Sequence, residues 1–160
     1  MSHFNELEAL AAAGAEFVQV SGHEKRPVGA AWQTRSTSNL DTVGGWLRCG
    51  SNVGILLGVG GLIDIEHDDE DGRELLEGLD LPPTVQWASA RGAHRLYRLA
   101  DDLPPRAVVK LGPLEVRLGG RAAQSVLPPS VHPTGVAYRW ESPPSAVDIA
   151  TITLADICVG

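Results

Sequence analysis

Short apolar runs separated by turn residues recur along the chain, and eighteen Gly and eleven Pro favour many short elements over long helices. Runs rich in β-branched and aliphatic residues predict strands. We expect strands at residues 17–20, 52–57, 62–66, 84–88, 94–99, 107–110, 114–118, 122–127 and 137–140. Only a glycine-rich segment separates 52–57 from 62–66, so these two strands are predicted to form a hairpin. Residues 84–88 and 94–99 are predicted to form a second pair.

Three segments have helical character. Residues 5–13 are rich in helix formers, and Ser38 or Asn39 can cap a helix that runs to about Cys49. Residues 68–79 carry acids in their first turn, where the helix dipole favours negative charge. The tail after Pro144 fits either a strand or a helix. Together these elements predict one α+β domain over residues 1–160, dominated by antiparallel pairing.

Composition is that of a soluble globular domain, with 43% hydrophobic and 21% charged residues. The start has no secretory signal pattern, and no apolar run reaches the ~20 residues that span a membrane. We expect Cys49 and Cys158 to be reduced and the protein to be cytoplasmic, without a membrane partner.

The net charge of −7 argues at first against a nucleic-acid partner, but the charge is unevenly distributed. Residues 64–74 hold seven acids and one Arg, a net of −6, whereas residues 91–121 hold seven bases and three acids, a net of +4. An acidic segment beside a basic one suits a site that holds cations and a polyphosphate together. Two solvated faces would give the same pattern.

Asp64 and Glu66 are the first candidates for chemistry. Side chains alternate across a strand, so these carboxylates share one face while Ile63 and Ile65 point into the core. Two carboxylates this close raise each other's pKa unless a cation lies between them. Most isolated pairs of this kind simply face water. The apolar residues that precede the pair favour a central strand and hence a site.

Further candidates follow along the chain. Glu115 shares a strand face with Arg117, and the pair is either a surface ion pair or the source of a third metal ligand. His94 follows a turn that contains Gly92, which is a plausible phosphate cradle, although a lone histidine is more often structural. The rigid segment PPSVHPTG holds Ser130 and His132, and an ordinary Pro-rich turn is the alternative.

The order of these motifs is more specific than any one of them. The series K-R-P…W, N-V-G-I-L-L-G, G-L-I-D-I-E, G-A-H-R-L-Y, L-E-V-R-L-G-G and P-P-S-V-H-P-T-G-V-A-Y-R-W resembles the bifunctional DNA primase/polymerase domain. That family belongs to the archaeo-eukaryotic primase superfamily and often stands at the front of plasmid and phage replication proteins. The resemblance covers about residues 10–141.

The resemblance implies a role for each matching residue. Asp64, Glu66 and Glu115 would be catalytic ligands of two Mg²⁺ or Mn²⁺ ions. His94 would contact the phosphates of the incoming nucleotide. Ser89 and Arg91, in the loop before His94, would assist in binding the nucleotide. Ser130 and His132 match the family loop that borders the active site and would also contact the nucleotide. The family fold implies a small α/β unit joined to a unit like an RNA-recognition motif, with the site in the cleft between them.

The implied activity is template-dependent nucleotidyl transfer from (d)NTPs on single-stranded or primed DNA, in plasmid, phage or mobile-element replication. A helicase or a helical priming domain would be a partner. Such domains commonly follow this module and have no counterpart in the sequence, so extension is expected rather than priming. Gly92 stands where relatives commonly have Ser, and Glu115 stands where many have Asp.

Two alternatives remain open. One is a non-catalytic nucleotide- or DNA-binding module of a replication initiator. The other is a metal-dependent hydrolase, or a cupin-type metalloenzyme that uses His94 or His132 with Glu115.

Overall fold

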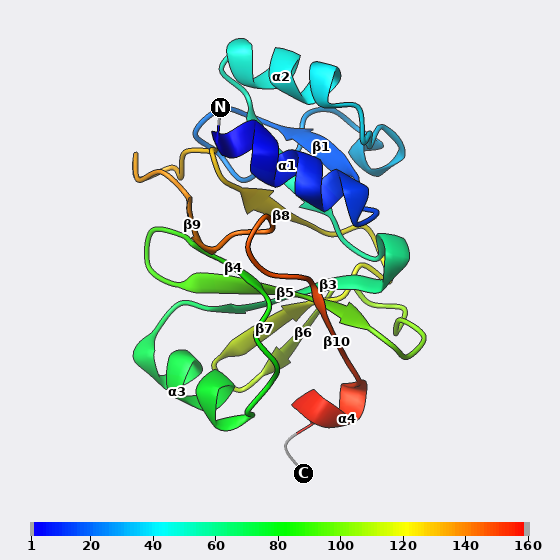
Figure 1. Ribbon diagram of the computed structural model, residues 1–160, viewed down its shortest axis with the longest axis vertical. Helices are drawn as coiled ribbons and strands as arrows, with labels where there is room; N and C mark the ends of the chain where they lie inside the picture. The colour runs from blue at the N-terminus through cyan, green and yellow to red at the C-terminus, as the bar shows by residue number, and fades with distance from the viewer. Residues whose placement is uncertain (1, 159–160) are drawn as a thin grey trace.

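The computed structural model describes residues 2–158 and contains two stacked β-sheets with helices on both outer sides (Figure 1). The small sheet has the order β1 (Phe17–Val20), β2 (Asn52–Leu56), β8 (Gln124–Leu127). The large sheet has the order β6 (Val108–Leu111), β7 (Leu114–Arg117), β3 (Leu62–His67), β5 (Ala93–Leu99), β4 (Val85–Ala88), β9 (Arg139–Ser142). All these neighbours are antiparallel, and β10 (Ala150–Ile152) adds a parallel pairing to the end of β5.

Helices cover the outer face of each sheet. Helices α1 (Ser2–Ala12) and α2 (Leu40–Arg48) pack on the small sheet, and the Asn39 side chain accepts hydrogen bonds from the first amides of α2. Helices α3 (Glu70–Gly78) and α4 (Leu154–Ile157) pack on the outer face of the large sheet. No helix among residues 2–158 is long and apolar enough to cross a membrane. The α+β class and the largely antiparallel sheets are as predicted.

The predicted hairpin of 52–57 with 62–66 is wrong, because the two strands lie in different sheets. A short 3₁₀ turn, Val59–Gly61, carries the chain from the small sheet to the large one. Residues of both strands are buried, so each is a central strand with neighbours on both sides, contributed by distant parts of the chain. Strand β8, at the edge of the small sheet, also has a distant partner: it follows β7 in sequence yet pairs with β2.

Two glycines allow the connections between the sheets to pass in contact. Gly58 and Gly119 both have positive φ, at 93° and 71°. A Cβ on either one would collide with the main chain of the other connection. Only glycine fits such a close approach of two backbones. The crossing therefore fixes how the small sheet sits over the large one.

The large sheet has two buried faces, and this determines where its polar residues lie. Leu62 and Leu96 face the small sheet and join its core, whereas Ile63 and Ile65 face α3 and α4. By strand alternation, Asp64 and Glu66 point toward the small sheet with Leu62. The carboxylates of β3 therefore lie between the two sheets rather than on an outer surface.

Candidate functional site

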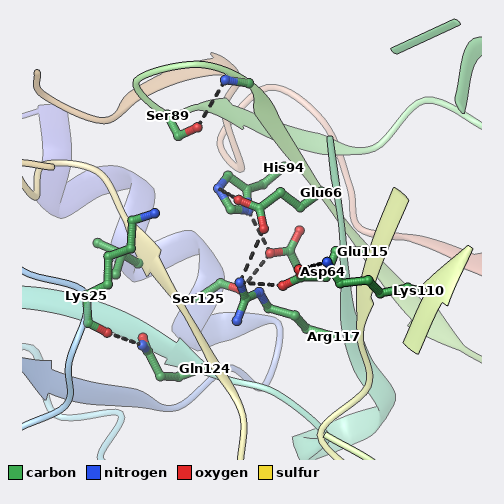
Figure 2. A network of polar contacts seen from close by, with 12 residues as sticks. Lys25, Asp64, Glu66, Ser89, His94, Lys110, Glu115, Arg117, Gln124 and Ser125 are labelled. Carbon is green, nitrogen blue, oxygen red and sulfur yellow. Dashed lines mark hydrogen bonds and ion pairs between the residues drawn. The ribbon is translucent and has the colours of Figure 1, made fainter. Parts of the chain in front are cut away.

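The strand register brings the sequence-predicted carboxylates together. Glu66 on β3 is paired directly with Glu115 on β7 and with His94 on β5. Asp64, two residues earlier, is paired with Arg117 on β7. The first three side chains form a row across β7, β3 and β5, and the other two form the next row on β3 and β7. Figure 2 shows all five gathered in one cluster.

Asp64 is the most deeply buried member, with no exposed surface. Its Oδ2 atom accepts a hydrogen bond from His94 Nδ1 at 2.7 Å and another from Ser125 Oγ at 2.5 Å. Ser125 belongs to β8, so this second bond joins the two sheets. Asp64 Oδ1 is buried and has no hydrogen-bond partner among the described residues. A buried carboxylate oxygen without a donor is unusual.

His94 lies between the two carboxylates of β3. Its Nε2 atom is 3.3 Å from Glu66 Oε2, and its ring stacks on Trp87 with centroids 4.9 Å apart. Burial alone would lower the pKa of His94, but the charge of Asp64, the hydrogen bond to it and the charge of Glu66 outweigh burial. The pKa is therefore raised, and the imidazolium form holds both carboxylates.

Arg117 and Lys110 supply the remaining positive charge. Arg117 Nη2 lies 3.2 Å from Glu66 Oε1 and 2.7 Å from Glu115 Oε1. Lys110 Nζ is 3.8 Å from Glu115 Oε2 and is largely exposed. Burial raises the pKa of Glu66, and neighbouring Asp64 adds to this rise, while His94 and Arg117 act against it. Glu66 is thus a carboxylate whose charge is only partly compensated.

A cavity of about 160 Å³ opens beside this cluster, between the two sheets. Its wall consists of Lys25, Glu66, His94, Arg117, Gln124, Ser125, Val126 and Tyr138. Asp64 lies behind this wall, in contact with two of its members. Burial raises the pKa of Tyr138 to about 12, and the Glu66 charge contributes to the rise. The phenol therefore stays neutral at physiological pH.

The donor set fits a hard divalent cation. Three carboxylates from two neighbouring strands offer the oxygen ligands that Mg²⁺ and Mn²⁺ prefer. The unpartnered Oδ1 of Asp64 is an open oxygen ligand, and the raised pKa of Glu66 reflects the cost of burying its charge beside Asp64. Within residues 2–158, however, no three His, Cys, Asp or Glu side chains surround a common metal position. Arg117 and His94 hold the carboxylate oxygens instead.

The loop before His94 lies apart from the carboxylates. Ser89 and Arg91 line a second cavity on the other face of β5, and Ser89 Oγ accepts a hydrogen bond from the Gly92 amide at 3.3 Å. A Cβ at Gly92 would collide with the main-chain carbonyl of His67. The close approach of the two backbones therefore leaves no room for a side chain at this position.

The segment PPSVHPTG is tied to the small sheet. Ser130 is 2% exposed; its hydroxyl accepts a hydrogen bond from the Val53 amide at 2.9 Å and donates one to the Val53 carbonyl at 3.1 Å. The Asn52 side chain donates a hydrogen bond to the Val131 carbonyl and accepts one from the Val131 amide. Ser130 is not part of the cavity wall, so its contacts anchor the loop.

His132 lies at the rim of the site. Its ring centroid is 5.9 Å from that of Tyr138, and its Nδ1 atom accepts a hydrogen bond from the Thr134 amide at 3.1 Å. Partial burial lowers the pKa of His132, as do the positive charges of Lys25 and Arg91. The predicted nucleotide contacts of Ser130 and His132 stay predictions, with His132 the better placed.

Sequence reasoning missed Ser125, Gln124 and Tyr138 as parts of the site. Ser125 is a small polar residue inside a strand whose next two residues, Val126 and Leu127, are buried apolar. A buried polar residue in such a strand needs a partner, and this was the available signal.

The fold and the site define an α+β domain whose main polar feature is a carboxylate and arginine cluster between two sheets. The family model for the bifunctional DNA primase/polymerase, N-terminal domain, matches residues 7–154, and the chain belongs to this family. No curated protein sequence matches the chain. Family membership confirms the resemblance, indicates a primase/polymerase-type function, and implies nucleotide and DNA substrates.

Proposed function

We propose that this chain transfers nucleotides from (d)NTPs to a DNA primer in a template-dependent reaction that uses Mg²⁺ or Mn²⁺. The observation that carries the proposal is Asp64, a buried carboxylate with an unpartnered oxygen beside the incompletely compensated Glu66. Catalytic carboxylates of this kind belong at a site where positive charge is added with the substrate. The setting would be plasmid, phage or mobile-element replication, with a helicase or helical priming domain as a partner.

Asp64, Glu66 and Glu115 would hold two divalent ions. Bound there, such ions would offset the charge of the triphosphate and make the attacking 3′-hydroxyl more acidic. The residues of the chain then have separate tasks. Ser125 holds Asp64 in place across the sheets through its 2.5 Å hydrogen bond. Keeping ligands in a fixed geometry supplies much of the rate in such reactions.

The cavity wall supplies the contacts for phosphate groups. Lys25 and Arg117 present positive charge on this wall, where phosphate oxygens are attracted. His94 would keep its Nδ1–H on Asp64, and its Nε2–H would donate to a phosphate oxygen once Glu66 moves away to hold a metal ion. Arg117 likewise exchanges Glu66 for phosphate. The side chains that hold the carboxylates in the free protein thus become the nucleotide contacts.

A gel assay tests the proposal, with primed and unprimed templates crossed with dNTPs and NTPs in Mn²⁺ and in Mg²⁺. We expect the parent protein to extend the primer and the Asp64→Ala variant to lose extension. Asp71→Ala is the matched control, since Asp71 is an exposed acid on α3. Extension by Asp64→Ala at the parental rate would overturn the assignment of Asp64.

A second candidate is a nucleotide-binding module without chemistry. The observation in its favour is that Arg117 and His94 occupy the carboxylates, with no metal-holding cluster among residues 2–158. Nucleotide binding by calorimetry, without incorporation under either metal, would establish this alternative.

A further inference from the structure

A second cavity lies on the opposite face of β5, with a volume of about 370 Å³. Successive residues of β5 alternate between the faces, so His94 reaches the carboxylate site and Arg95 reaches this second cavity. The same alternation at the end of β3 separates Glu66 from His67. The two cavities share no lining residue.

The charged side chains of this second cavity are mainly basic. They are Arg73, Arg91, Arg95 and Arg139, with Glu77 and Glu141 as the acids, which leaves 4 − 2 = +2 in a chain whose net charge is −7. Arg73 is neutralised by Glu70 and Glu77, and Glu141 accepts a hydrogen bond from Gln86 at 3.0 Å. The other three arginines have no carboxylate within ion-pair distance among residues 2–158.

Two buried nitrogen atoms of this cavity lack hydrogen-bond partners. His67 is only 9% exposed, and its Nδ1 atom has no partner in the described residues. Arg95 Nε is also buried and without a partner. Buried polar atoms of this kind are normally satisfied by protein, water or ligand. The Arg95 Nε–H donor beside guanidinium groups without carboxylate partners indicates an anion as the missing partner, to which His67 can donate in its Nδ1–H tautomer.

We propose that this cavity binds a backbone phosphate of a single-stranded DNA substrate. Planar guanidinium groups match phosphate oxygens, which accounts for Arg91, Arg95 and Arg139 around one space. The wall contains small residues such as Ala88, Ala90 and Gly92 and no Phe, Tyr or Trp side chain, and the ring of His67 is buried, so the wall offers little surface on which a base would stack. A phosphate contact without a base contact positions a strand without reading its sequence.

That the cavity binds a phosphate group follows from its own residues; that this phosphate belongs to a DNA strand rests on the proposed function. A strand held here would pass the β4–β5 turn, which joins this cavity to the strand that carries His94. The phosphate site would thereby keep the DNA next to the reacting groups without contacting them.

Fluorescence anisotropy with a labelled single-stranded oligonucleotide, in EDTA, tests the proposal. The variants are Arg95→Gln with Arg139→Gln, and Arg139→Gln alone; Arg48→Gln, an exposed arginine on α2, is the matched control. We expect the double variant to bind about tenfold more weakly, and the slope of log affinity against log salt to fall by ~0.7 per lost phosphate contact. Arg48→Gln should bind like the parent.

Melting temperatures show which variants fold. If the double variant does not fold, Arg139→Gln decides alone, because Arg139 is exposed and its loss should still weaken binding by about threefold. Parental oligonucleotide affinity in the folded variants would overturn the proposal. A titration with a deoxynucleoside triphosphate forms the second arm, and we expect it to be unchanged.

A loss of triphosphate affinity instead of oligonucleotide affinity would assign the cavity to a free nucleotide and overturn the strand assignment. Because binding is measured without metal or extension, a parent protein that fails to extend primers would refute the proposed function while leaving this result intact.

Discussion

The two cavities on either side of β5 differ in how their charges are balanced. In the carboxylate site every charged group of the wall except Lys25 contacts an opposite charge, with Arg117 and His94 shared between acids. In the second cavity three arginines have no such partner among residues 2–158. The charges of the carboxylate site are therefore largely paired within the protein, whereas the arginines of the second cavity are available to a ligand.

This difference shows how one strand serves two environments. His94 and Arg95 are neighbours in sequence, as are Glu66 and His67, and alternation sends the members of each pair to opposite faces. The acidic and basic segments of the sequence therefore do not map onto one acidic and one basic surface. Each contributes side chains to both cavities.

The largest expected effect comes from removing a charge in the carboxylate site. Glu66→Gln removes the acid that touches both His94 and Arg117, and we expect primer extension to fall by about 10²–10³-fold. Glu74→Gln, an exposed acid on α3, is the control. Extension by Glu66→Gln within twofold of the parent would remove Glu66 from the reaction.

Two buried serines allow a residue that contacts the carboxylate site to be compared with one that only stabilises the fold. Ser125→Ala removes a donor to Asp64, so we expect a stability loss of about 1–3 kcal/mol and a ~10–100-fold loss of Mn²⁺ affinity. Ser130→Ala removes the bonds to Val53, so we expect a similar stability loss with Mn²⁺ affinity unchanged. Urea unfolding and calorimetry measure the two quantities. Equal Mn²⁺ affinities in both variants would contradict a positioning role for Ser125.

The sequence predicted the parts of the site that depend on local pattern. Alternation in β3 placed Asp64 and Glu66 on one face, and the motif order identified Glu115 and His94 as their companions, which the register confirms as neighbours. The first inference needs only the period of a strand, and the second rests on the order of the motifs. They do not require knowledge of what lies opposite that face.

The remaining features depend on contacts between distant segments. The contact of Ser125 with Asp64 spans 61 residues and requires β8 to pair with β2 in a sheet separate from β3, whereas the predicted hairpin put the 52–57 and 62–66 strands in one sheet. Gly92 lies so close to the main chain of His67 that no Cβ fits, and the sequence around Gly92 does not show this approach. Strand partners and backbone approaches of this kind are set by topology, which local periodicity does not encode.

The pH dependence of stability tests the ion pairs that close the carboxylate site. The pKa of Glu66 is raised from 4.5 by burial and by Asp64, and the pKa of His94 is raised from 6.5 because Asp64 and Glu66 outweigh burial. The folded state then binds more protons than the unfolded state, so stability falls as pH rises. We expect the Glu66 contribution to be lost from pH 4.5 up to its folded pKa. The His94 contribution is likewise lost from pH 6.5 up to its own.

Melting temperatures in EDTA between pH 5 and 9 measure this dependence, with His94→Gln as the comparison. The variant should lose the part of the decline above pH 6.5. A parental curve that stays level or rises across that range would show that His94 is neutral in the folded protein. The second cavity supplies the contrast, because Arg139→Gln removes no group that titrates near neutral pH and should leave the shape of the curve unchanged.

The smallest expected effect lies at the exposed edge of the carboxylate site. Lys110 is 3.8 Å from Glu115, with 77% of its side chain exposed, so water screens the pair. We expect Lys110→Met to change the free energy of unfolding by about 0.5 kcal/mol or less, and to leave extension within about twofold, because Arg117 still holds Glu115 at 2.7 Å. Urea unfolding and the primer assay measure both. A large loss of extension would mean that Lys110 contacts the substrate, and the open side of the site would then extend along β6.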